Sequence, residues 1–198
     1  MCGIVGLLLK KPALRPQLGE LMVPMLIGMT ERGPDSAGLA VFTDPLPASM
    51  RKISVYSGLT EEGSDYAWSG LVDALNAELK VQAKASVKAN HAVITFEGDA
   101  DPVKAFVKAY GPKLHLLSTG RSIDLYKDIG TPAEVAARYR FSELQGSHLV
   151  GHTRMATESA VTPDRAHPFT AGEDFCLVHN GSLSNPNGVR RMLEPRGI

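Results

Sequence analysis

A short apolar run at the very start of the chain, Gly3 to Leu9, constrains the possible folds most strongly. It contains the β-branched residues Ile4 and Val5, and a run of this length and composition predicts a buried strand. Because the strand begins almost at the terminus, Cys2 stands at its tip. The fold must therefore be one in which a terminal strand is built into a core.

A helix and a second strand follow this first strand. Apolar residues recur at helical spacing over 17–30, and Pro24 is expected to kink or shorten that helix. A charged turn with a glycine and a proline comes next, and Ser36 to Phe42 predicts a strand. The first part of the chain is thus a strand–helix–turn–strand unit.

The middle of the chain, about 45–145, has a different character and predicts a small α/β insert. A helix over 132–139 has Thr131 as its N-cap and proline at its first position. No catalytic cluster is visible in this region. The other expected elements are helices over 68–80 and 102–110 and strands over 92–96 and 114–117.

Strand signals return near the end of the chain, over 147–152 and 175–179, and each strand leads into a polar or glycine-containing turn. Short strands that deliver polar residues at their ends commonly build a functional site there. The last segment contains Pro186, Gly188 and Pro195 and no complete closing element, which suggests that the domain is truncated.

Composition excludes several classes of protein. The 198 residues are 43% hydrophobic, enough for one large core, and the 21 acidic residues balance the 21 basic ones. A chain with this balance has no net positive charge that would attract nucleic acid or an anionic membrane surface. The initial apolar run is too short to span a bilayer and no cationic segment precedes it, so we expect a cytoplasmic protein with reduced cysteines. Cysteine and histidine spacing indicates no metal site.

Cys2 is the first candidate for chemistry. A small second residue normally allows Met1 to be removed, which leaves a cysteine with a free α-amine. That amine titrates near about 7.7–8.0, so it can accept the thiol proton and no separate base is needed. A cysteine at position two is also often incidental, and this residue alone does not decide the matter.

Two later segments offer groups that suit an amino-acid amide as substrate. Arg154 ends a predicted strand, and its guanidinium can bind a carboxylate through two hydrogen bonds. The Asn180 amide and the Gly181 N–H can point at one spot and stabilise an oxyanion. The alternatives are an ordinary ion-paired arginine and an Asn-Gly hairpin turn.

The charged turn before the second strand is interpreted as structural support for the site. Arg32 and Asp35 are able to pair within it, and Gly38 allows close packing. We expect no direct catalytic role for this turn.

Four segments of the chain occur in the order seen in class II glutamine amidotransferases, which are N-terminal-nucleophile hydrolases. They read Met-Cys-Gly-Ile-Val-Gly, Arg-Gly-Pro-Asp-Ser-Ala-Gly, Gly-His-Thr-Arg-Met-Ala-Thr and His-Asn-Gly-Ser-Leu. The chain resembles that family over its two ends, about 2–42 and 147–185. It looks most like the free-standing subunits related to glutamate synthase, including that of N-methylglutamate synthase.

This resemblance implies an α+β fold, the αββα sandwich of two antiparallel sheets, with the α/β insert added to it. It further implies that Cys2 attacks the glutamine side-chain amide and that Asn180 and Gly181 form the oxyanion hole. The domain would span 1–198 and hydrolyse glutamine to glutamate and ammonia through a thioester.

The resemblance also implies how substrate and partners are bound. Arg154 would hold the substrate carboxylate, and Thr157 and His179 would line the pocket. Separate synthase subunits, some carrying flavin or iron–sulfur centres, would use the ammonia, while this chain itself needs no cofactor. We expect the insert to dock such a subunit, since a connection of roughly 120 residues needs structure of its own.

One departure from the family pattern leaves two alternatives open. The family usually has a later aspartate that binds the substrate α-amine, and no matching motif appears before the chain ends. The chain could instead be a catalytically idle structural or glutamine-sensing subunit with the same fold. A third possibility is an N-terminal-nucleophile amidase that acts on another amide.

Overall fold

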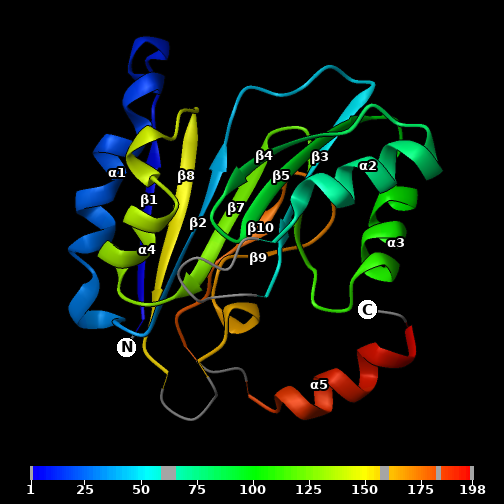
Figure 1. The fold of residues 1–198 in the computed structure, drawn as a ribbon. Coiled ribbons are helices and arrows are strands. Elements are labelled where there is room, and N and C mark those ends of the chain that lie inside the picture. The colour runs from blue at the N-terminus through cyan, green and yellow to red at the C-terminus, as the bar shows by residue number, and fades with distance from the viewer. Residues whose placement is uncertain (1, 59–65, 157–160, 182–183, 197–198) are drawn as a thin grey trace.

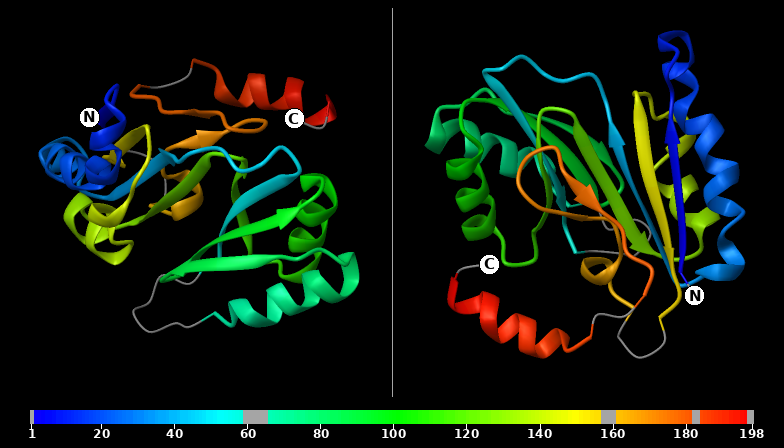
Figure 2. Two further views of the ribbon diagram at one scale, coloured as in Figure 1. Left: turned by 90° about the horizontal axis from the view of Figure 1, so that it is seen from above. Right: turned by 180° about the vertical axis from the view of Figure 1, so that it is seen from behind.

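The computed structural model describes residues 2–58, 66–156, 161–181 and 184–196. Two four-stranded sheets, antiparallel throughout, pack against each other, and helices cover the outer side of each (Figure 1). The predicted α+β class and the αββα sandwich are therefore confirmed. The four layers are seen edge-on in the left view of Figure 2.

The first sheet joins strands from both ends and from the middle of the chain. One of them, β2 (Ser36–Phe42), has the predicted bounds. In spatial order the strands are β1 (Gly3–Leu8), β8 (His148–Arg154), β2 (Ser36–Phe42) and β7 (Ile123–Ile129). Helix α1 (Leu18–Ile27) lies on β1 and β8, while α4 (Pro132–Arg138) lies on β2 and β7. This sheet brings the two terminal parts of the chain side by side.

Helix α1 is held to the sheet by one apolar face. Leu18, Met22 and Leu26 recur every four residues and are almost completely buried. Burial of each such side chain contributes about 1.5–3 kcal/mol. Pro24 lies within the helix on its exposed side. The helix ends at Ile27 and is shorter than predicted, with the 3-10 turns η1 (Pro12–Gln17) and η2 (Thr30–Arg32) before and after it.

The second sheet is formed entirely by the middle of the chain. Its strands, in spatial order, are β4 (Lys84–Lys88), β5 (His91–Glu97), β3 (Met50–Tyr56) and β6 (His115–Gly120). Helices α2 (Trp68–Leu79) and α3 (Ala100–Tyr110) cover its outer face. The helices and strands predicted for this region are present, and β3, β4 and β7 are added to them.

The region predicted as an insert is thus an integral half of the sandwich. Residues 45–145 provide the whole second sheet and also contribute β7 and α4 to the first. Deleting them would remove one face of the shared core. A deletion therefore cannot separate assembly with a partner from folding, and the docking role of this region stays a prediction.

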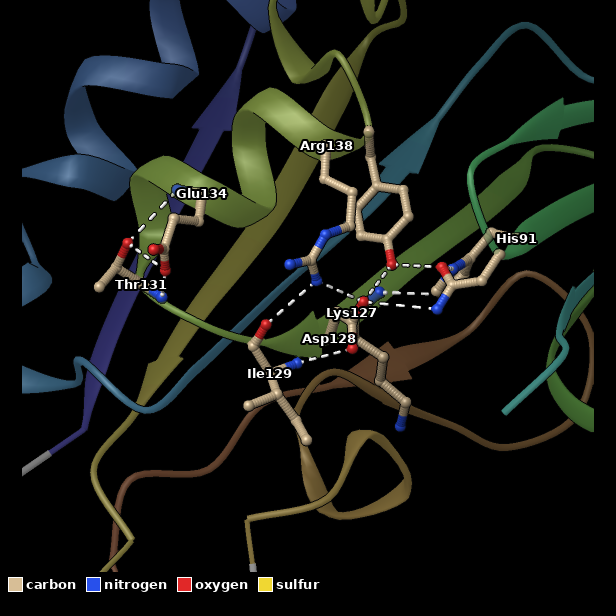
Figure 3. Close-up of polar contacts among 9 residues, drawn as sticks. His91, Lys127, Asp128, Ile129, Thr131, Glu134 and Arg138 are labelled. Atoms are coloured by element: carbon tan, nitrogen blue, oxygen red, sulfur yellow. Dashed lines mark hydrogen bonds and ion pairs between the residues drawn. The ribbon is translucent and has the colours of Figure 1, made fainter. Parts of the chain in front are cut away.

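A buried polar network fastens the two sheets together at one end of the sandwich (Figure 3). Asp128 of β7 accepts hydrogen bonds from the Tyr139 hydroxyl at 2.5 Å and from Arg138 Nη1 at 2.6 Å. The side-chain oxygen of Asn90, at the turn before β5, accepts from His91 Nδ1 at 3.0 Å and lies 2.6 Å from the same tyrosine hydroxyl. Burial lowers the pKa of His91 to about 3, so its ring is neutral at physiological pH.

Thr131 caps α4 as predicted, in a capping box with Glu134.

The C-terminal part lies across the open side of the sandwich. A two-stranded hairpin, β9 (Phe169–Thr170) with β10 (Cys176–Leu177), contacts the edge strand β6. The strand predicted over 175–179 is therefore shorter than expected. Helix α5 (Pro186–Leu193), which was not predicted, follows. Further 3-10 turns are η3 (Phe141–Glu143), η4 (Pro163–Arg165) and η5 (Glu194–Arg196). Among the described helices, none is long and apolar enough to cross a bilayer.

Candidate active site

Sheet register places Cys2 beside Arg154. In the β1–β8 pair Gly3 lies opposite Thr153, so residue 2 continues the register opposite residue 154. Gly3 is required for this approach, because a Cβ there would lie 2.7 Å from both Met29 Cβ and Thr153 Oγ1. Cys2 is half-buried and its thiol is not in a disulfide. The predicted nucleophile therefore stands at a strand tip next to the predicted carboxylate clamp.

The Arg154 side chain points to the inner face of the sheet. Thr153 points to the helical side, where its hydroxyl donates to the Met29 carbonyl at 3.2 Å. Strand alternation turns residues 152 and 154 to the inner side, which faces the second sheet. Arg154 is only 8% exposed. A largely buried guanidinium at this position is suited to grip the acid group of a small substrate.

Asn180 is brought to the same strand tip from the far end of the chain. Its Nδ2 donates a hydrogen bond of 2.8 Å to the carbonyl oxygen of Cys2. The amide has a second N–H, which donates to no protein acceptor in the described ranges. Gly181 follows with φ +153°, a backbone conformation that favours glycine. Besides any part that the Asn-Gly pair has in a turn, its Asn180 side chain therefore contacts the predicted nucleophile.

Asp35 supports the end of β8 by a different contact from the one predicted. Its Oδ2 accepts from the Ala156 N–H at 2.7 Å, and its own N–H donates to the Arg154 carbonyl at 3.1 Å. Arg32 is exposed, and no ion pair joins it to Asp35 within the described part of the chain. The predicted pairing in this turn is wrong, because Asp35 faces the backbone of 154–156 instead of solvent. Thr157, predicted to line the pocket, lies outside the described residues.

Two histidines outside the predicted site, His152 and His167, connect to His179, which was predicted to line the pocket. The His152 and His167 rings pack against each other at a tilt of 36° with centroids 4.3 Å apart, and His152 Nε2 donates to the His179 carbonyl at 3.1 Å. The His179 ring itself is exposed. Burial lowers the pKa of both His152 and His167 to about 4. His152 stands two residues before the arginine of its motif, and this spacing, which returns it to the same strand face, was the signal available in the sequence.

Other chemistry is sparse around this site. Within the ranges that the structure describes, no three His, Cys, Asp or Glu side chains are grouped to hold a metal ion. Cys176 is the second free thiol; it is half-buried, and burial raises its pKa. The described groups predicted to act on substrate are a thiol, an amide and a guanidinium, and the Asp35 carboxylate holds the backbone beside them.

Known proteins similar to this chain carry related names. The glutamine amidotransferase-like protein GlxB of Rhizobium meliloti is 48% identical over 200 residues, which is 100% of this chain and 64% of that protein. A protein of Methanothermobacter thermautotrophicus named "Putative glutamine amidotransferase" is 32% identical over 219 residues, 100% of this chain and 66% of that protein. The chain thus spans just under two thirds of the length of these relatives.

A more distant similarity covers one part of the chain. The glutamine–fructose-6-phosphate aminotransferase of Methanococcus maripaludis is 34% identical over 77 residues, 38% of this chain and 13% of that protein. No family model matches the chain. The subfamily prediction, a free-standing subunit related to glutamate synthase, stays a prediction. With the four motifs, the sandwich fold and these relatives in agreement, the chain belongs to the class II, N-terminal-nucleophile glutamine amidotransferases.

Proposed function

We propose that this chain hydrolyses glutamine to glutamate and ammonia, with Cys2 as the nucleophile after removal of Met1. The hydrogen bond from Asn180 Nδ2 to the Cys2 carbonyl oxygen supports this proposal most strongly. It brings a donor for an oxyanion to the residue whose sulfur would attack. Arg154, at the adjacent strand end, completes the set of groups that hydrolysis of an amino-acid amide requires.

The first half of the reaction forms a thioester. The α-amine of Cys2 takes the proton from Sγ, and the thiolate attacks the side-chain amide carbon of glutamine. The amide oxygen becomes an oxyanion, which accepts hydrogen bonds from the Asn180 side chain and the Gly181 N–H. The amine returns its proton to the leaving nitrogen as the C–N bond breaks. Ammonia departs and the γ-glutamyl group remains on sulfur.

The second half uses water in place of the thiol. The free α-amine accepts a proton from a water molecule, and the oxygen of that water attacks the thioester carbon. The Asn180 side chain and the Gly181 N–H stabilise the second oxyanion. Collapse breaks the C–S bond, and the proton returns to sulfur. Glutamate is released and Cys2 is regenerated, so each cycle consumes one glutamine and one water.

Substrate recognition is assigned to the residues around the strand tip. Arg154 binds the α-carboxylate, and Asp35 holds the backbone of 154–156 that carries it. Thr157 and His179 line the pocket in this proposal. The ammonia passes to a synthase partner, of the glutamate-synthase or N-methylglutamate-synthase kind, and flavin or iron–sulfur centres reside on that partner.

Intact-mass measurement before and after treatment with a diazo-ketone analogue of glutamine tests the proposal. We expect a chain that lacks Met1 and gains one equivalent of label on Cys2. The Cys176→Ala variant is the matched control: it loses a thiol that burial makes less reactive, and it should label like the wild type. Retained Met1, or a Cys2 that stays unlabelled, would instead favour the idle or glutamine-sensing subunit.

A further inference from the structure

Three residues form one continuous row across the inner face of the first sheet. His152 of β8 lies opposite Gly38 of β2, and Gly38 lies opposite Lys127 of β7. We call His152, Gly38 and Lys127 the support row. Lys127 comes from the middle of the chain, where the sequence revealed no residue of the site.

The chain segment 166–168 rests directly on the centre of the support row. A Cβ added to Gly38 would lie only 2.1 Å from the His167 carbonyl oxygen, so the backbone there occupies the space of the missing side chain. Lys127 Nζ donates to the carbonyls on either side, to Ala166 at 2.8 Å and to Pro168 at 3.3 Å. The backbone of the segment is therefore fixed at three successive residues.

Burying the Lys127 ammonium at this position costs it the favourable free energy of hydration. The side chain is 5% exposed, and its Nζ also lies 4.6 Å from the centre of the Phe169 ring. A buried cation is tolerated only where hydrogen bonds and favourable charge contacts replace its hydration. A methionine would fill similar space without that desolvation cost, but it could not hold the two carbonyls.

The other end of the support row reaches the candidate oxyanion donor. The His152 ring packs at a tilt against the His167 ring, and its Nε2–H donates to the His179 carbonyl, one residue before Asn180. Asn180 then donates to the Cys2 carbonyl. An unbroken series of contacts thus runs from β7 to the tip of β1.

We propose that Lys127 and His152 are positioning residues for glutamine hydrolysis, holding 166–168 and 179–181 in the place that aligns Asn180 with Cys2. This inference rests on the proposed function. Neither residue touches the reacting atoms. Displacement of a catalytic donor by about 1 Å can lower a rate on the order of 100-fold, so loss of either contact reduces turnover more than it reduces binding.

Two matched pairs of variants test the support row. His152→Gln keeps a side-chain N–H that can reach the His179 carbonyl, whereas His152→Met has similar bulk and no donor. Lys127→Met is matched with Lys52→Met, which removes another buried ammonium, on β3 of the second sheet, where Lys52 pairs with Asp124 of β7 at 2.7 Å. We expect His152→Met and Lys127→Met to lower kcat about 10- to 100-fold with KM changed less than about threefold. His152→Gln and Lys52→Met should stay within about threefold of the wild type.

Alkylation of Cys2 separates positioning from general damage. Labelling by the diazo-ketone glutamine analogue needs an aligned oxyanion donor, while iodoacetamide needs only an accessible thiolate. We expect His152→Met and Lys127→Met to slow the first reaction and leave the second unchanged. If His152→Met equals His152→Gln in kcat and labelling, the inference is overturned. The comparison of the two His152 variants tests the inference even if Lys127→Met does not fold. A wild type with no glutaminase turnover would instead overturn the proposed function.

Discussion

The side-chain amide of Asn180 is hydrogen-bonded to the backbone carbonyl of Cys2 at 2.8 Å, across 178 positions of the chain. The contact fixes the candidate oxyanion donor relative to the candidate nucleophile before substrate is present. Preorganised donors of this kind stabilise a transition state without further rearrangement. The distance between these two residues is therefore the geometric basis of the proposed activity.

Replacing Asn180 with alanine removes both amide N–H groups from the strand tip. We expect kcat for glutamine hydrolysis to fall about 100- to 1,000-fold, the usual effect of losing one oxyanion donor. The residue is exposed, so the midpoint of thermal unfolding should shift little. Steady-state ammonia release and a melting curve measure the two effects. Full turnover by Asn180→Ala would remove this residue from the proposed mechanism.

Gly38→Ala and Gly6→Ala form a matched pair of strand substitutions in the first sheet. The added Cβ at position 38 would lie 2.1 Å from the His167 carbonyl oxygen, whereas at position 6 the nearest atom is 3.8 Å away. We expect Gly38→Ala to destabilise the protein by about 1–3 kcal/mol and to impair turnover. Gly6→Ala should change the free energy of unfolding by less than about 0.5 kcal/mol. Urea denaturation of both variants decides the matter, and equal effects would contradict the close packing at Gly38.

Strands made of apolar residues could be predicted from the sequence, whereas strands that carry buried polar residues could not. β2 is apolar and was predicted with its correct bounds, as was the N-cap of α4. β3 and β7 were missed because they carry polar or charged residues that are nevertheless buried, such as Lys52 and Asp128. Lys52 pairs with Asp124 of β7, and Asp128 with Arg138 and Tyr139 at the end of α4, so a local pattern of apolar residues cannot reveal these strands.

The same limit applies to the candidate site. Cys2, Arg154 and Asn180 stand in recognisable motifs, and the structure brings them to one strand tip. Lys127 stands in no motif. Its contact with the segment beside His167 depends on the β2–β7 register and on the missing side chain of Gly38, which only the folded sheet supplies.

Acid should destabilise the fold through buried neutral histidines. The pKa of His91 is lowered by burial from its ordinary 6.5 to about 3. At pH values between these two pKa values, His91 binds a proton in the unfolded chain but not in the folded chain. Stability from this residue is therefore fully present above pH 6.5 and falls as the pH drops toward 3, with a steepest slope of about 1.4 kcal/mol per pH unit.

The His91→Gln variant isolates this contribution. Glutamine cannot titrate, so the free energy of unfolding of the variant should depend less steeply on pH than that of the wild type between about pH 6 and 4. Urea unfolding at several pH values measures both slopes. His152 and His167, whose pKa values burial lowers to about 4, remain in both proteins and leave a residual slope. Identical slopes in the two proteins would mean that His91 is protonated in the folded state.

Arg154 should decide whether the enzyme requires an α-carboxylate on its substrate. A hydrogen bond to a charged group contributes about 1.5–3 kcal/mol, so the wild type should prefer glutamine over its α-carboxamide analogue by about 10- to 100-fold in kcat/KM. Arg154→Gln should lose activity on glutamine and approach equal use of the two substrates. Because the readout is a ratio, partial unfolding affects both substrates alike and cannot imitate the result. Arg154→Lys keeps the charge without the planar fork and should retain an intermediate preference. A wild type that uses both amides equally would point to an amidase for a different substrate, since the guanidinium would then have no acid group to bind.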